Sequence, residues 1–189
     1  MASTAAANAS VVEEFHKLAI DHLQAAAIAL FSDYGKDLQV SESTKEEKRR
    51  LSLSLGAAIG FTSEHVRGVL AIAVDERLAK DMNPLSTDDS GAENSKANST
   101  DWIGELANQL LGRLKNKLLA NGVELALSTP VVVQGTHLRL GAVHRRATRL
   151  LFTDAENQAH VWWDAEVDSD LVISESTEEP QSEGEMVLF

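Results

Sequence analysis

The organisation of this chain is clearest between residues 101 and 122, which read DWIGELANQLLGRLKNKLLANG. Apolar residues recur there at spacings of three and four, which is typical of an amphipathic helix packed on a core. At about 100° per residue, Asp101, Glu105, Asn108 and Gly112 fall within roughly 60° of one another. The other side is occupied by Leu106, Leu110, Leu111, Leu114 and Leu118. The pattern therefore predicts a helix that presents a carboxylate and a carboxamide together on its polar face.

The ends of this helix also carry local signals. We expect Ser99 or Thr100 to cap its N-terminus, so that Asp101 adds a favourable negative charge in the first turn. Asn121-Gly122 is expected to end it. Inside the helix, Gly112 costs about 1 kcal/mol of helix propensity relative to alanine. A glycine at this position removes the side chain where the backbone of a partner could approach.

Hydrophobic periodicity and turn residues predict further elements on both sides of this helix. They are a helix over 11–31, strands over 51–61 and 68–74, a short helix over 75–82, and strands over 123–134, 145–152 and 159–167. This order predicts an α+β fold in which long helices pack on a mainly antiparallel sheet, with a loose internal duplication.

Composition separates a domain from an acidic tail. The net charge is −12, and residues 150–189 contain 11 acidic residues but neither Lys nor Arg. We expect a disordered N-terminus at 1–9, one domain over 10–174 and an acidic tail over 175–189. Nucleic acid is a poor partner for such a chain, because affinity for it depends on neutralising phosphates. No apolar run reaches the ~18–20 residues of a membrane span and no signal-peptide pattern is present, which predicts a cytoplasmic protein without membrane contact.

The residues that could hold a metal are sparse. The chain has no cysteine and six histidines. The histidines do not stand at the spacings at which two of them would share a metal ion. We therefore expect neither disulfides nor a metal site of the protein's own.

The motif Asp101-x3-Glu105-x2-Asn108, followed by Gly112 and later by Pro130, resembles that of the CheC/CheX/FliY phosphatases of bacterial chemotaxis. Those proteins dephosphorylate the response regulator CheY. The sequences AAIGF at 57–61 and GVLAIAV at 68–74, followed by a helix start, are similar to the corresponding part of CheX. The resemblance covers roughly residues 10–170, and it implies the CheC/CheX-like variant of the predicted fold.

The resemblance also implies roles for the motif residues. Asn108 would enter the active site of the receiver domain and orient the water that attacks phosphorus, while Glu105 would pair with a lysine of the receiver. Asp101 would be a secondary binding contact, Gly112 would leave room for docking, and Pro130 would be structural. The phosphoaspartate and Mg²⁺ would belong to the receiver, so this chain would need no cofactor of its own.

Three interpretations stay open from the sequence. The chain is a phosphatase that acts in trans on the phosphoaspartate of a CheY-like receiver, a non-catalytic CheX-fold module that binds a receiver or another signalling protein, or a structural domain. In the last case Glu105 and Asn108 are solvated helix residues without further role. The first helix has Glu13 and His16 in place of Glu105 and Asn108, which predicts one site per chain. The family resemblance also allows a homodimer.

Overall fold

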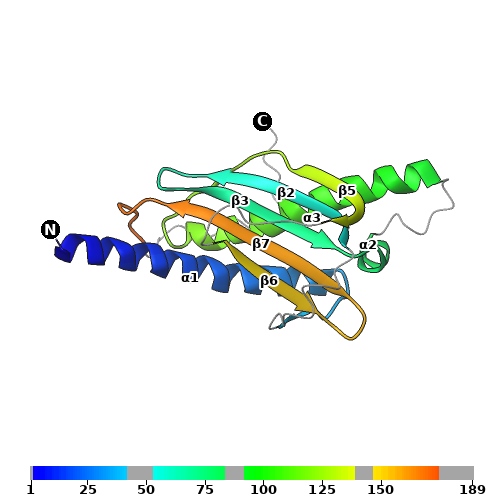
Figure 1. The fold of residues 1–189 in the computed structure, drawn as a ribbon, viewed down its shortest axis with the longest axis horizontal. Helices are drawn as coiled ribbons and strands as arrows, with labels where there is room; N and C mark the ends of the chain where they lie inside the picture. The colour runs from blue at the N-terminus through cyan, green and yellow to red at the C-terminus, as the bar shows by residue number, and fades with distance from the viewer. Residues whose placement is uncertain (1, 42–52, 84–91, 139–146, 175–189) are drawn as a thin grey trace.

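The protein has two layers, a twisted sheet and a pair of long helices that run along one face of it (Figure 1). The computed structural model describes residues 2–41, 53–83, 92–138 and 147–174. The helices are α1 (Ala2–Asp33), the short α2 (Glu76–Met82) and α3 (Ala92–Leu119). This arrangement confirms the predicted α+β fold class.

The sheet has seven strands among the described residues, and its neighbouring strands are antiparallel. The strands are β1 (Gln39–Ser41), β2 (Leu53–Thr62), β3 (Val66–Val74), β4 (Ala126–Leu127), β5 (Val131–Leu138), β6 (Thr148–Thr153) and β7 (Gln158–Val167). Their order is β1-β6-β7-β3-β2-β4, and β5 also pairs with β2. The single strand predicted over 123–134 is thus two strands, interrupted just before β5 at Pro130, whose nitrogen cannot donate to a ladder.

The chain contains two halves with the same order of elements. In each half a long helix is followed by outer strands (β1, or β4 and β5) and then by a hairpin (β2–β3, or β6–β7). The outer strands are exchanged, because β1 pairs with β6 whereas β4 and β5 pair with β2. At the centre, β3 and β7 pair from Val66↔Val167 to Val74↔Ala159. This exchange confirms the predicted loose duplication.

The core lies between the sheet and the two long helices. Alternate strand residues point to this side, and Ile59, Leu70 and Trp163 there are fully buried. They form one apolar cluster with residues of both helices, among them Leu23 and Leu110. Burial of each such side chain contributes about 1.5–3 kcal/mol before the loss of conformational entropy. The core therefore holds one side of α1 and α3 and leaves the other side of each helix to solvent.

Both long helices end in the same glycine motif. Gly35 and Gly122 have φ of 71° and 78°, in the left-handed region that glycine adopts without strain. After α1, two backbone N–H groups donate to carbonyls of the last turn at 2.8 and 2.9 Å; after α3, the corresponding distances are 2.9 and 3.0 Å. This pair of hydrogen bonds is the Schellman motif. The predicted end of α3 at Asn121-Gly122 is confirmed.

The first helix is longer than the periodicity indicates. It begins at Ala2 and not near Val11, so the segment 1–9, expected to be disordered, is helical from residue 2 on. Residues 2–9 are mostly alanine, the residue with the highest helix propensity, and they continue the helix at little cost. Across the described residues, no helix has the length and apolarity that a membrane span requires. The acidic tail predicted over 175–189 lies outside the described residues.

The turn between β6 and β7 is organised by one carboxylate. Asp154 accepts hydrogen bonds from the backbone N–H groups of Glu156 (2.8 Å) and Asn157 (2.7 Å), and from the side-chain amide of Asn157 at 2.9 and 3.1 Å. These bonds favour the charged form, and the amide of Asn157, followed by the backbone N–H of Glu156, lowers the pKa of Asp154 below its ordinary value.

We expect Asp154→Ala to lower the stability of the protein at neutral pH and much less in acid. At pH 7 the loss is about 1 kcal/mol, or roughly 2–4 °C in melting temperature, because the carboxylate is exposed and its bonds are partly screened. A depressed folded-state pKa gives stability that is present above the unfolded pKa of about 3.9 and lost as the pH falls through the folded value. Thermal denaturation of both proteins between pH 7 and pH 3 measures this. An equal difference in melting temperature between the two proteins at both pH values would show that the charge of Asp154 does not contribute to stability.

Candidate functional site

The candidate site is an exposed strip on α3, on the side away from the sheet. Asp101 and Glu105 are exposed, while Asn108 and Gly112 are half-buried. The opposite side of the helix is fully buried at Ile103, Leu106, Ala107, Leu110, Leu111, Leu114 and Leu118. The two-sided helix predicted from the sequence is therefore present, and it presents an acid and an amide together. We call Asp101, Glu105, Asn108 and Gly112 the polar strip.

The beginning of α3 differs from the prediction. The helix starts at Ala92, so Ser99 and Thr100 lie inside it and do not cap it. Asp101 is accordingly far from the first turn, beyond which the helix dipole has little effect on a charge. Serine and threonine cost a helix only a few tenths of a kcal/mol each, so their preference for capping positions is easily overridden. The charge of Asp101 is thus available to a partner and does not serve the N-terminus of the helix.

Two residues that the sequence analysis did not single out lie next to the polar strip, one in contact with Glu105 and the other in contact with the first. The side-chain amide of Gln109 donates to Glu105 Oε1 at 3.1 Å. The Tyr34 hydroxyl, at the end of α1, donates to Gln109 Oε1 at 3.4 Å. The spacing of four between Glu105 and Gln109 on a helix was a usable signal for the first contact. No local signal connects Tyr34 with a helix that begins more than fifty residues later.

On the other flank of the polar strip, β5 approaches α3 at a glycine. A Cβ atom placed on Gly104 would lie 3.4 Å from Val132 Cγ2 and 3.7 Å from Pro130 Cγ. Gly104 is buried, and the absence of a side chain lets the strand come this close. Pro130 is therefore beside the helix residue that precedes Glu105, which agrees with the structural role expected for it.

The charges around the strip come from both helices. Arg113, one turn beyond Gln109, forms an ion pair with Asp33 at 2.5 Å, and its side chain is only 18% exposed. In contrast, no described residue forms a hydrogen bond with the side-chain amide of Asn108. An amide can donate and accept at the same time and does not titrate. Asn108 can therefore position a polar reactant, such as a water molecule, that reaches this surface.

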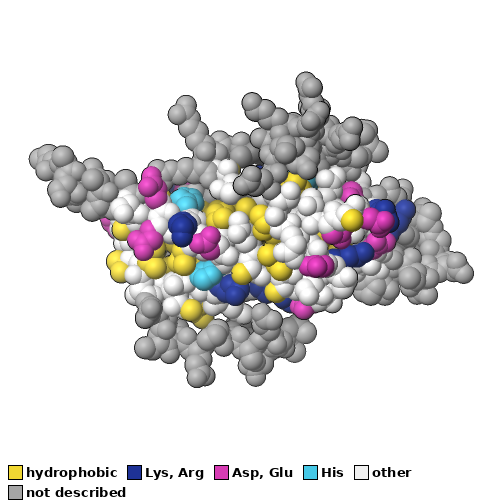
Figure 2. Space-filling view, turned by 90° about the horizontal axis from the view of Figure 1, so that it is seen from below, with side chains coloured by type: hydrophobic (Ala, Val, Ile, Leu, Met, Phe, Trp, Pro, Cys, Tyr) yellow, Lys and Arg dark blue, Asp and Glu magenta, His cyan; other side chains and the backbone are white. Residues whose placement is uncertain are grey.

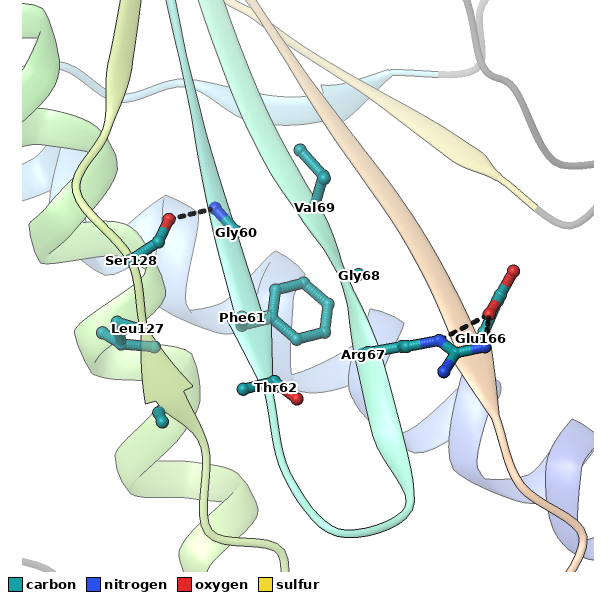
Figure 3. A pocket seen from close by; sticks show the side chains of 10 residues that line it. Gly60, Phe61, Thr62, Arg67, Gly68, Val69, Leu127, Ser128 and Glu166 are labelled. Atoms are coloured by element: carbon teal, nitrogen blue, oxygen red, sulfur yellow. Dashed lines mark hydrogen bonds and ion pairs between the residues drawn. The ribbon is translucent and has the colours of Figure 1, made fainter.

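A depression of about 510 Å³ lies elsewhere, over the ends of β2, β3 and β4 (Figure 3). Its lining includes Phe61, Val69 and Leu127, and it contains no residue of the polar strip. At its rim, the guanidinium of Arg67 is paired with Glu166 at 2.6 Å. The two ionisable groups of this depression, Arg67 and Glu166, are thus already paired with each other.

Charged side chains of both signs are interspersed over the described surface seen in Figure 2. Among the charged side chains of the described residues, Lys36 is paired with Asp81 at 2.8 Å and Lys17 with Asp21 at 3.4 Å. Within the described ranges, no group of three or more His, Cys, Asp or Glu side chains is placed to hold a metal ion. The polar strip, with two exposed carboxylates and a half-buried amide, thus lies at the surface of the helix.

Comparison with known proteins identifies the family to which this chain belongs. The sequence model of the family described as chemotaxis phosphatase CheX matches residues 55–152. No curated protein sequence gives a significant match. Because the matched region spans just over half of the chain, including most of β2, all of β3 and the polar strip, the chain belongs to the CheX family of chemotaxis phosphatases.

Solved structures agree with this assignment at the level of the fold. A CheC-like protein from Shewanella sp. PV-4 superposes with a TM-score of 0.67 at 19% identity, over 79% of this chain and 97% of that one. Chemotaxis protein CheX from Vibrio vulnificus gives 0.62 at 21% identity, over 79% and 95%. CheX in a CheX–CheY–BeF3–Mg²⁺ complex from Borrelia burgdorferi gives 0.63 at 18% identity, over 78% and 97%. The suspected CheX-like family membership is confirmed.

The surroundings of Gly112 give a stability prediction. A Cβ atom on Gly112 would have no other atom within 4 Å, apart from its own helix and chain neighbours. Gly112→Ala should therefore raise stability by up to about 1 kcal/mol, or roughly 2–4 °C in melting temperature. Gly122→Ala is the matched control: its φ of 78° and a Ser174 Oγ atom at 2.7 Å predict destabilisation instead. Thermal denaturation compares the three proteins, and a lower melting temperature for Gly112→Ala would mean that this position is packed.

Proposed function

We propose that this protein is a phosphatase that acts in trans on the phosphoaspartate of a CheY-like receiver domain. The observation that carries the proposal is the polar strip itself. A helix in a CheX-family fold presents Glu105 and an Asn108 amide that no described residue engages, and Gly112 leaves space beside them. The Borrelia burgdorferi structure, in which CheX is in complex with CheY, BeF3 and Mg²⁺, supports a receiver as the type of partner.

In the proposed reaction, water attacks phosphorus in line and the bond from phosphorus to the aspartate oxygen breaks, which releases inorganic phosphate. Such a reaction needs chiefly a positioned water molecule and charge balance. The amide of Asn108 would accept a hydrogen bond from the water and hold it in line. Because the amide does not titrate, it keeps this ability over a wide pH range.

The carboxylate of Glu105 would serve docking. It would pair with a lysine in the active site of the receiver and so fix the orientation of α3 over the phosphoryl group. The phosphoaspartate and Mg²⁺ would both belong to the receiver, so Glu105 would not be needed as a metal ligand and could bind the lysine. Asp101, on the same strip, would make a secondary contact.

Replacement of Asn108 separates catalysis from binding. Asn108→Ala should reduce the acceleration of phosphate release by roughly 10²-fold or more, because the amide acts mainly in the transition state. Affinity for a receiver held in its phosphorylated form by beryllofluoride should stay within about threefold of the wild-type value. Asn116→Ala, a change of the same type farther along α3, is the control and should leave both values unchanged.

Two results would contradict the proposed role. Near-normal turnover by Asn108→Ala would remove the amide from the mechanism. A wild-type protein that binds the phosphorylated receiver without accelerating phosphate release would instead identify a non-catalytic CheX-fold interaction module.

Glu105→Gln should weaken receiver binding by about tenfold, because the lysine then loses its charged partner at a partly desolvated interface. Titration of the beryllofluoride-treated receiver at low and high salt measures this. The difference in receiver affinity between wild type and variant should persist at high salt, since a desolvated ion pair is screened less than an exposed one. Glu124→Gln, an exposed acid beyond the end of α3, is the control. Equal affinities for wild type and Glu105→Gln would make Glu105 an ordinary solvated residue.

A further inference from the structure

A chain of hydrogen bonds connects the end of α1 to the polar strip on α3. The hydroxyl of Tyr34 donates to Gln109 Oε1 at 3.4 Å, and Gln109 Nε2 donates to Glu105 Oε1 at 3.1 Å. Only this orientation of the Gln109 amide satisfies both neighbours, since the reverse would turn its oxygen toward the carboxylate. The carboxylate, which can only accept, thus sets the orientation of the Gln109 amide, and the amide oxygen is then turned toward the Tyr34 hydroxyl, which donates to it.

Tyr34 is itself held in place. It is the last residue before Gly35, in the Schellman motif that ends α1, where backbone hydrogen bonds fix its main chain. Its ring lies edge-on to Trp102, with centroids 6.4 Å apart and planes at 87°. The next residue toward the N-terminus, Asp33, pairs with Arg113. A fixed part of the first half of the chain therefore reaches the functional helix of the second half.

The other half of the molecule contains a matching contact. Asn121 stands before Gly122 at the end of α3, as Tyr34 stands before Gly35, and its Oδ1 atom lies 3.0 Å from His22 Nε2 on α1. His22 precedes Tyr34 by the same number of residues as Gln109 precedes Asn121. The two contacts are thus equivalent under the internal duplication, and each joins the end of one long helix to the middle of the other.

The two contacts differ in what lies beyond them. Four residues before Gln109 stands Glu105, whereas four residues before His22 stands Leu18. A contact between the residue before the glycine and a polar residue of the other helix is therefore present in both halves. The additional bond from Gln109 to a carboxylate belongs to the half that carries the polar strip, and helix packing does not account for it.

We propose that Gln109 and Tyr34 are positioning residues that hold the carboxylate of Glu105 ready for the cation of its partner. The inference rests on the proposed function, in which Glu105 binds a lysine of the receiver. A held carboxylate loses less side-chain freedom when the partner arrives. Gln109 is suited to this task because it donates a hydrogen bond without neutralising the charge that the lysine requires.

The test uses Gln109→Ala and Tyr34→Phe in the full chain. Gln109→Ala should weaken affinity for the beryllofluoride-treated receiver, and raise KM for the phosphorylated receiver, by about 3- to 10-fold. Tyr34→Phe, which keeps the ring on Trp102, should do so by about 2- to 5-fold. The rate at saturating receiver should stay within about twofold of wild type, because Asn108 is untouched.

His22→Ala is the matched control. It removes the equivalent contact in the other half, so it tests for a general effect of helix packing, and we expect it to leave receiver affinity unchanged. A double-mutant cycle provides the second readout: in a Glu105→Ala background, Gln109→Ala should have no further effect on affinity, because the group that it positions is gone. Circular dichroism confirms that each variant is folded.

The outcomes separate this inference from the proposed function. If Glu105→Gln and Asn108→Ala both behave as wild type, the proposed function fails, and the positioning role fails with it. If Glu105→Gln loses binding and Asn108→Ala loses turnover as expected, but Gln109→Ala matches wild type or His22→Ala in affinity, the positioning role alone is overturned. The same holds if Gln109→Ala weakens binding equally with and without Glu105.

Discussion

The pairing of β3 with β7 is the interaction on which the rest of the structure depends. It joins the two halves of the chain along nine residue pairs, from Val66↔Val167 to Val74↔Ala159. Because the two hairpins pair there, the outer strands of each half can pair with the hairpin of the other half. The helices of both halves lie on one face of the resulting sheet. Trp163 of β7 stacks on Phe61 of β2, with centroids 4.4 Å apart and planes at 7°, so the core also crosses the boundary between the halves. This central pairing fixes the sheet on which α3 packs, and it therefore determines which side of α3 is exposed.

Much of this fold could be predicted from local sequence. Alternation and helical periodicity placed the strands and the polar face of α3, since both patterns report which side chains meet the core. Boundaries that depend on weak preferences were misplaced: α1 begins at Ala2 and α3 at Ala92, where alanine-rich or merely tolerant sequence continues a helix without a hydrophobic stripe. Strand exchange could not be predicted, because it depends on which edges remain free after the hairpins have formed.

The candidate site shows the same division. Glu105 and Asn108 stand on one helix at a spacing that the sequence displays directly, and their exposure follows from the leucines opposite. Gln109 contacts Glu105 at a spacing of four that the sequence also displays, whereas Tyr34 reaches Gln109 by a contact between α1 and α3 that no spacing along the chain encodes. The role of Gly104 was also missed, because its reason is the approach of Pro130 and Val132 from β5. Residues that act through tertiary contacts are thus the ones that sequence analysis does not reach.

Duplication explains why the two long helices share a core but differ on their outward sides. The matching glycine motifs at Gly35 and Gly122 set the correspondence between α1 and α3, and this correspondence differs from the one suggested by Glu13 and His16. Counted from the glycines, the positions that match Glu105 and Asn108 on α1 are Leu18 and Asp21. Both helices use their buried sides for the same core, so their outward sides are free to diverge without loss of the fold. Tyr34 of the first half nevertheless reaches Gln109, the neighbour of Glu105 on α3, so the surroundings of the proposed site come from both halves of the duplicated domain.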